Sequence, residues 1–419
     1  MHSALRRWPL SAAALGLALS GPCATSALAD PAPSYRVLLG QSQATAPRLA
    51  EARSDISRAE GLARQASARP NPTVGLTVEN FAGNGRYRDF GGSEATASIE
   101  QTLELGGKRT ARIAVGRAEV ELARARGKQA QADFAFDLAD AYAQAEASER
   151  RVQLATDALS LAREDARIAG ALVRAGKEAD LRSIQARAGV QAAVAALEDA
   201  RAGSAGAFGK LTALSGSERP FTTLPAGLLA HADRADVIVA PDSLASPAYL
   251  AALAAREAAA RRVRVEQSRR TPDVNASLGL RRLYGDNALA MVGGVSAPLP
   301  LFNRNSGAVA GARAELAGAD ARLNAARLDA LAEARSATVR AAAAQTRIVA
   351  AREGEVAADE AYRLTRVGYE AGKLSLIELN AARRALSDAR AQTLAARLDR
   401  LSAEAALARL QGLTPFGDQ

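Results

Sequence analysis

The chain has 419 residues, of which 48% are hydrophobic, 24% are charged and only 4% are aromatic, and its formal net charge is +9. This composition excludes a disordered chain, a small disulfide scaffold and a polytopic helical membrane protein. Basic and acidic residues interleave, as in Arg163, Glu164 and Asp165, so no stripe of one sign forms that could follow a nucleic-acid backbone.

The beginning of the chain has the pattern of a secretory signal. Arg6 and Arg7 precede an apolar run over residues 11–19, and the Ala-Leu-Ala at 27–29 forms a small-x-small cleavage site. Cleavage there removes Cys23, the only cysteine; lipidation of Cys23 is the alternative, although a proline precedes it where a small residue is expected. No later stretch approaches the roughly 18 consecutive apolar residues of a spanning helix, so the sequence predicts an exported protein without a helical membrane anchor.

Two separated motifs recur at one constant offset. Ala175-Gly176-Lys177 is repeated 196 positions later at 371–373, and the Arg-Ala-Glu at 117–119 is repeated the same distance on, at 313–315. A constant offset between separated motifs indicates a tandem duplication rather than chance similarity between Ala-rich segments. Each copy has the same predicted order of elements: a helix, two short strands, a very long helix, a turn at Ala-Gly-Lys and another helix.

The duplication divides the chain into five predicted segments. The stretch between the two copies contains three prolines and Leu-rich pieces, which is typical of an irregular connector rather than a separate domain. The segments are the signal peptide at 1–29, the first repeat at 30–214, the connector at 215–246, the second repeat at 247–412 and a C-terminal tail at 413–419.

Long helices are the main predicted elements. One helix is expected over about residues 36–68, where Pro70 and Pro72 end it. Between 108 and about 174 nothing breaks a helix except scattered glycines, and such a helix would extend roughly 100 Å at 1.5 Å per residue. An ordinary coiled-coil rod would explain these helices, but it would not explain the strands.

Each copy also contains two short segments in which apolar and polar residues alternate, which is the pattern of β-strands. They cover about 73–80 and 95–103 in the first copy, and about 273–280 and 289–297 in the second. Residues 81–92 are rich in glycine, asparagine and charge, as expected of a hairpin loop. The sequence therefore predicts a mainly α fold with a small β part.

Alternating strands of this length suit either a soluble subdomain or a transmembrane barrel. Export and the equivalent positions of the two hairpins in the duplication favour the barrel. Four strands cannot close a barrel, whereas three chains with twelve strands can enclose an open lumen, so we predict a homotrimer. The apolar positions expected to face outer-membrane lipid are Val74, Leu76, Val78, Ile99, Val274 and Leu278.

Together with these features, the segment Gln-Thr-Leu-Glu-Leu-Gly-Gly-Lys-Arg at 101–109 resembles the TolC-type outer-membrane efflux proteins. The Leu-Glu-Leu-Gly-Gly-Lys-Arg part most resembles the cobalt-zinc-cadmium branch of heavy-metal efflux channels. The resemblance implies a trimeric 12-stranded barrel in the outer membrane of a Gram-negative cell, continued by a periplasmic α-helical barrel. It also implies a periplasmic membrane-fusion adaptor and an inner-membrane RND-type pump as partners.

The resemblance further implies where the adaptor docks, because the Arg-Val-Gly-Tyr at 366–369 resembles the periplasmic tip of such channels. The alternative is that each Ala-Gly-Lys simply turns one helix into the next. Asp180 could form a ring of three carboxylates that narrows the tunnel, or it could be a solvated acid at a helix start. The positions expected to dock the adaptor are Ala175, Gly176, Lys177, Val367, Gly368, Tyr369, Ala371, Gly372 and Lys373.

Residues that carry metal and enzyme chemistry are scarce in the mature chain. After signal cleavage only His231 and Met291 remain as histidine and methionine, which argues against a tight metal site, a cofactor and a Ser-His-acid triad. The Gly-Gly-Lys-Arg at 106–109 lacks the Ser or Thr that a phosphate loop requires. We therefore expect no enzyme activity.

The function predicted from these patterns and the resemblance is a passive outer-membrane conduit. It would export divalent heavy-metal cations of the cobalt, zinc and cadmium type, driven by the inner-membrane pump. One alternative is the same duct serving multidrug efflux or type I secretion. Another, of a different class, is a periplasmic coiled-coil scaffold without a channel.

Overall fold

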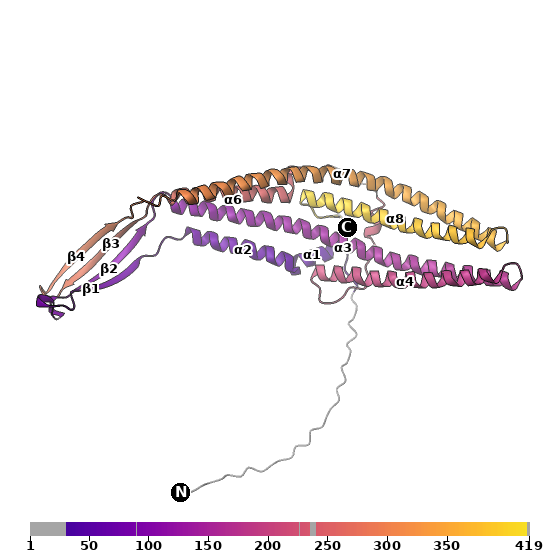
Figure 1. The fold of residues 1–419 in the computed structure, drawn as a ribbon, viewed down its shortest axis with the longest axis horizontal. Helices are drawn as coiled ribbons and strands as arrows, with labels where there is room; N and C mark the ends of the chain where they lie inside the picture. Colours follow the sequence, from indigo (N-terminus) through magenta and orange to yellow (C-terminus); the bar gives the residue numbers. More distant parts are fainter. Residues whose placement is uncertain (1–30, 89, 226, 235–239, 417–419) are drawn as a thin grey trace, which may run out of the picture.

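The computed structural model describes residues 31–88, 90–225, 227–234 and 240–416. The predicted signal peptide, with Cys23, lies outside these residues. The molecule is elongated, with a β-sheet at one end and the turns of two long helical hairpins at the other (Figure 1). The predicted mainly α fold with a small β part is confirmed.

The sheet has four antiparallel strands in the order β1-β2-β3-β4, two from each repeat. They are β1 (Thr73–Glu79), β2 (Glu94–Leu103), β3 (Val274–Leu283) and β4 (Ala288–Ser296). The β3 strand runs three residues past its predicted end, because residues 281–283 continue the ladder with residues 94–96 of β2. The β1–β2 loop contains two short 3₁₀ turns, Gly85–Tyr87 and Phe90–Gly92.

Two long helices continue from the sheet to the opposite end of the molecule (Figure 1). The longer is α3 (Lys108–Arg174), whose bounds match the prediction, and α7 (Ser306–Glu370) is its counterpart in the second repeat. Each turns back into a shorter helix, α4 (Asp180–Ser215) and α8 (Leu376–Gln411) respectively.

The single helix predicted over 36–68 is wrong, because the structure has two helices there. The first, α1, spans Tyr35–Thr45 and the second, α2, spans Pro47–Ser67. Pro47 lacks a backbone N–H and disfavours helical geometry at Ala46, which is extended, with φ −60° and ψ 124°. The prediction took only Pro70 and Pro72 as helix-ending residues and so missed this break.

In the residues of the connector that the structure describes, the backbone is irregular apart from two short turns of helix. These are α5 (Leu228–His231) and the 3₁₀ turn η3 (Ser243–Ala245), which precedes α6 (Pro247–Ser268). The buried Glu146 carboxylate of α3 holds the connector in place by accepting hydrogen bonds from the backbone N–H groups of residues 227–229, each at 3.1 Å.

The helices pack in one curved row. Both α2 and α4 contact α3 on one side, while α6 and α8 lie between α3 and α7 (Figure 1). Small side chains allow this close packing: Ala139, Ala141, Ala143, Ala145 and Ala147 of α3 are all buried in a core at the middle of the molecule. The row has two open edges, one formed by β1, α2 and α4 and the other by β4 and α7.

Candidate functional site

The strand register separates the sheet into an apolar and a polar face. Directly paired residues share a face, so Val74, Ile99 and Leu278, which lie opposite one another on β1, β2 and β3, point to the same side. All six positions that the sequence predicted to face lipid lie on this apolar face. Five further exposed apolar side chains extend this face: Leu103, Leu280, Leu289, Met291 and Val295.

The polar face carries hydroxyls, carboxylates and one arginine. Arg281 of β3 donates hydrogen bonds to Thr96 Oγ1 at 2.9 Å and to Glu94 Oε2 at 3.0 Å, both on β2. Its second terminal nitrogen lies 3.3 Å from Glu79 Oε2 on β1. One side chain therefore links three strands on this face.

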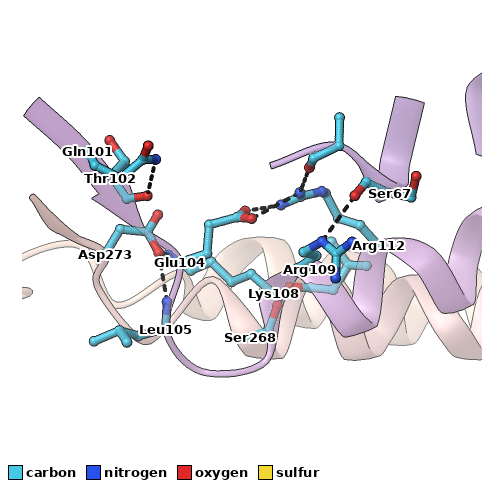
Figure 2. Close-up of polar contacts among 12 residues, drawn as sticks. Ser67, Gln101, Thr102, Glu104, Leu105, Lys108, Arg109, Arg112, Ser268 and Asp273 are labelled. Atoms are coloured by element: carbon cyan, nitrogen blue, oxygen red, sulfur yellow. Dashed lines mark hydrogen bonds and ion pairs between the residues drawn. The ribbon is translucent and has the colours of Figure 1, made fainter. Parts of the chain in front are cut away.

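The motif at 101–109 forms the junction between sheet and helices (Figure 2). Both glycines after β2 are left-handed, with φ +68° at Gly106 and +72° at Gly107, so the chain reverses tightly before α3 begins. A Cβ on Gly106 would lie 2.6 Å from Thr271 Cβ, whereas one on Gly107 would meet nothing within 4 Å. Gly106 is therefore required both for its conformation and for its close approach to the second repeat.

The charged residues of the same motif, together with Arg112 three residues beyond it, tie the start of α3 to both repeats. Lys108 Nζ lies 2.8 Å from the Asp273 carboxylate, which also accepts a hydrogen bond from Leu105 N (Figure 2). Arg109 donates to the Ser67 carbonyl at the end of α2, and Arg112 donates to the Glu104 carboxylate. The motif that suggested the family resemblance thus fastens the start of α3 to α2 and to the residue before β3.

The two Ala-Gly-Lys turns lie at the end of the molecule opposite the sheet (Figure 1). Gly176 and Gly372 are left-handed, with φ +69° and +71°. The backbone N–H of Lys177 closes the first turn on Leu172 O at 2.9 Å, while Lys373 closes the second on Gly368 O at the same distance. Both lysine side chains are exposed.

The remaining predicted docking positions differ in exposure. Val367 is exposed, but Tyr369 is fully buried in a core shared by all four hairpin helices, so its side chain offers no docking surface in this arrangement. A Cβ on Gly368 would lie 2.6 Å from Leu374 Cδ1, which explains the glycine by packing. Asp180 is the exposed first residue of α4, where a negative charge complements the helix dipole.

A buried carboxylate near the tips joins the two hairpins. Asp165 of α3 is 2% exposed and accepts a hydrogen bond from Tyr362 Oη of α7 at 3.4 Å. Arg383 of α8 lies 3.5 Å from its other oxygen, and Arg366 of α7 contacts the neighbouring Glu164 at 3.4 Å. Burial raises the pKa of Asp165, and the Arg383 charge opposes that rise.

This cluster was not predicted from the sequence, although one signal was available. Leu154, Leu161 and Ile168 mark a heptad seam of α3, and Asp165 lies four residues after Leu161 and three before Ile168. That spacing places Asp165 on the packed side of the helix, where a charge requires a partner.

The part of the chain that the structure describes contains neither a metal-binding cluster nor a membrane-spanning helix. Among those residues, no group of three or more His, Cys, Asp or Glu side chains is arranged to hold a metal ion. No helix within the same ranges combines the length and apolarity needed to cross a membrane. His231 is packed in the connector, with Nε2 2.9 Å from Glu404 Oε1 and its ring edge-on to Phe416.

The chain is similar to heavy-metal resistance proteins. The family profile described as "Outer membrane efflux protein" matches residues 38–217 and 243–413. Nickel-cobalt-cadmium resistance protein NccC of Alcaligenes xylosoxydans xylosoxydans is 41% identical over 322 residues, which cover 76% of this chain and 72% of NccC. Nickel and cobalt resistance protein CnrC of Cupriavidus metallidurans is 44% identical over 297 residues, which cover 71% of this chain and 70% of CnrC. Cobalt-zinc-cadmium resistance protein CzcC of the same organism is 32% identical over 261 residues, which cover 62% of this chain and 61% of CzcC.

The fold is also that of solved outer-membrane proteins. The crystal structure of VceC from Vibrio cholerae superimposes with a TM-score of 0.74 over 90% of this chain and 96% of VceC. Sequence identity to VceC is 21%, so this likeness describes the fold alone.

Proposed function

Because the chain belongs to the outer membrane efflux protein family, we propose that it is the outer-membrane conduit of a tripartite system that exports divalent heavy-metal cations. The observation that carries the metal assignment is the similarity to NccC and CnrC, whose names both include nickel and cobalt. Energy for transport would come from an inner-membrane RND-type pump joined through a periplasmic adaptor. A conduit must release its cargo, which is consistent with weak rather than tight metal binding.

The two open edges of the protomer support assembly into a closed ring. One edge presents β1, α2 and α4 and the other presents β4 and α7, so copies can join head to tail, each edge meeting the opposite edge of the next. Three copies supply twelve strands, enough for a barrel with an open lumen. In this assembly the apolar face of the sheet contacts lipid and the polar face lines the lumen.

The proposed lipid contact predicts the effect of charge on the apolar face. Arginine at Leu76 or Leu278 should cost about 2 to 4 kcal/mol per site near the bilayer midplane and reduce insertion of the trimer. Thr77→Arg is the matched control, since Thr77 follows Leu76 but points to the polar face. The yield of heat-modifiable trimer in outer-membrane fractions measures the difference. Normal yields from both Leu76→Arg and Leu278→Arg would contradict the assigned facing.

At the opposite end, we assign adaptor docking to the exposed parts of the two turns. Lys177, Val367 and Lys373 present the accessible side chains there. Asp180 lies just beyond the first turn, and in a trimer it would contribute one carboxylate from each copy to a ring that attracts cations.

Growth of a clean deletion strain tests the cargo. The strain and its complemented parent should be compared on zinc, cobalt, cadmium, nickel and copper salts, beside a panel of hydrophobic drugs. We expect hypersensitivity to nickel and cobalt, restored by the wild-type gene. Sensitivity to drugs alone would contradict the metal assignment and favour a multidrug duct.

A further inference from the structure

The polar face of the sheet holds two carboxylates that oppose each other directly. Glu79 of β1 and Glu94 of β2 are paired in the strand register, close to the loop end of the sheet. Like charges directly opposite on neighbouring strands repel and destabilise a sheet. Some other group must therefore stabilise this pair.

Arg281 supplies that group, although it lies on β3 rather than on a strand next to β1. Its three guanidinium nitrogens are all engaged, with Nε on Thr96, Nη1 on Glu94 and Nη2 on Glu79. The guanidinium thus reaches across β2 and bridges the two carboxylates. Arg282, the next residue, points to the apolar face, where it pairs with Ala95 and Leu289.

Two adjacent carboxylates are also what a divalent cation binds, because carboxylate oxygens are hard ligands that coordinate it well. A planar guanidinium with several donors occupies the same oxygens through charge-assisted hydrogen bonds. The cluster of two acids and one base keeps one negative charge in each protomer, which attracts cations without offering a free chelating pair.

We propose that Arg281 prevents the barrel lumen from retaining the exported metal, by occupying Glu79 and Glu94 so that no divalent cation can bridge them. This inference rests on the proposed conduit function, since it needs the polar face to line a lumen. Conduction requires sites weak enough to release the ion, and an open pair of carboxylates in each of three protomers would slow passage.

Conductance of the purified full-length protein in planar lipid bilayers tests the inference, with cobalt chloride alone as the probe. Wild-type channels should conduct equally with and without millimolar cobalt. Arg281→Gln frees the two carboxylates, so we expect its current to be half-blocked at a cobalt concentration at least about tenfold below the millimolar concentration that leaves wild type unaffected. Arg282→Gln changes the adjacent arginine on the other face and should behave as wild type.

A second variant keeps the test independent of any folding defect in Arg281→Gln. Arg281→Gln combined with Glu94→Gln removes both the repulsion and the paired carboxylates, so cobalt block should disappear again. If Arg281→Gln channels are as insensitive to cobalt as wild type, the inference about Arg281 is wrong while the proposed conduit stands. The same holds if the double variant is blocked by cobalt as strongly as Arg281→Gln. Absence of channels in the wild type would contradict the proposed conduit, and the inference with it.

Discussion

Replacing Gly106 with alanine is expected to destabilise the junction between sheet and helices by about 2 to 5 kcal/mol. The left-handed backbone at φ +68° disfavours any Cβ, and here the new methyl group would also lie 2.6 Å from Thr271 Cβ. Thr271 precedes β3, so relief of the clash must move the second repeat away from the first. The yield and thermal stability of the trimer in detergent measure the loss.

Gly107→Ala is the matched control for this change. Gly107 has nearly the same conformation, with φ +72°, but a Cβ added there would have no atom within 4 Å. Only the backbone penalty of about 1 to 2 kcal/mol should remain. Equal losses in the two variants would show that the close contact with Thr271 contributes nothing.

Removing the Asp165 carboxylate is expected to separate the two helical hairpins near the tips. Asp165→Ala leaves the largely buried Arg383 without its acidic partner, and breaking a buried pair costs about 3 to 5 kcal/mol. Spin labels on Lys177→Cys and Lys373→Cys report the separation of the turns, and we expect a longer and broader distance distribution. Glu164→Ala removes the adjacent and more exposed carboxylate, whose ion pairs are screened by solvent, so it should leave the distribution narrow.

The same labels test the pH dependence of this contact. Burial raises the pKa of Asp165 above its ordinary value of 3.8, so the protonated carboxyl stabilises the closed hairpins more than the ionised one does, and this extra stability falls as pH rises from 3.8 through the raised value. The ionised carboxylate still pairs with Arg383, which opposes the rise in pKa and so limits this fall. The groups that face it are Tyr362 and Arg366 on α7, Arg383 on α8 and the neighbouring Glu164. Arg167, on the same helix, lowers the pKa of Glu164 below its ordinary value of 4.5. The stability linked to Glu164 is therefore present above pH 4.5 and is lost as pH falls below it, which is the opposite of the trend for Asp165.

The expected result is that the turns separate more as pH rises from about 4 towards neutrality. Asp165→Asn keeps the shape of the side chain but cannot ionise, so it should remove this part of the dependence. An unchanged profile in Asp165→Asn would assign the pH response to another group.

Features that repeat locally could be predicted from the sequence. The bounds of α3 and the common face of Val74, Ile99 and Leu278 follow from helical and strand periods that are visible in short windows. The break at Pro47 was equally local and was missed because the helix was extended to the later prolines.

Features that join distant segments could not be predicted in the same way. The partners of Asp165 are about 200 residues away, and Arg281 crosses an intervening strand to reach Glu79. No local pattern specifies such contacts, since they depend on how the two repeats pack. Tyr369 illustrates the reverse error: it lies beside a tip in the sequence, but the packing of four helices buries it.

The cobalt content of cells tests the central claim most directly. A strain that keeps its pump and adaptor but lacks this chain should be loaded with cobalt chloride, washed and assayed for metal over time beside the parent strain. We predict that the deletion strain retains cobalt. The wild-type gene should restore the release of cobalt from the cells, whereas the Leu278→Arg gene should not. Equal loss of cobalt from the deletion and parent strains would contradict the assignment of this chain as the outer-membrane conduit for metal export.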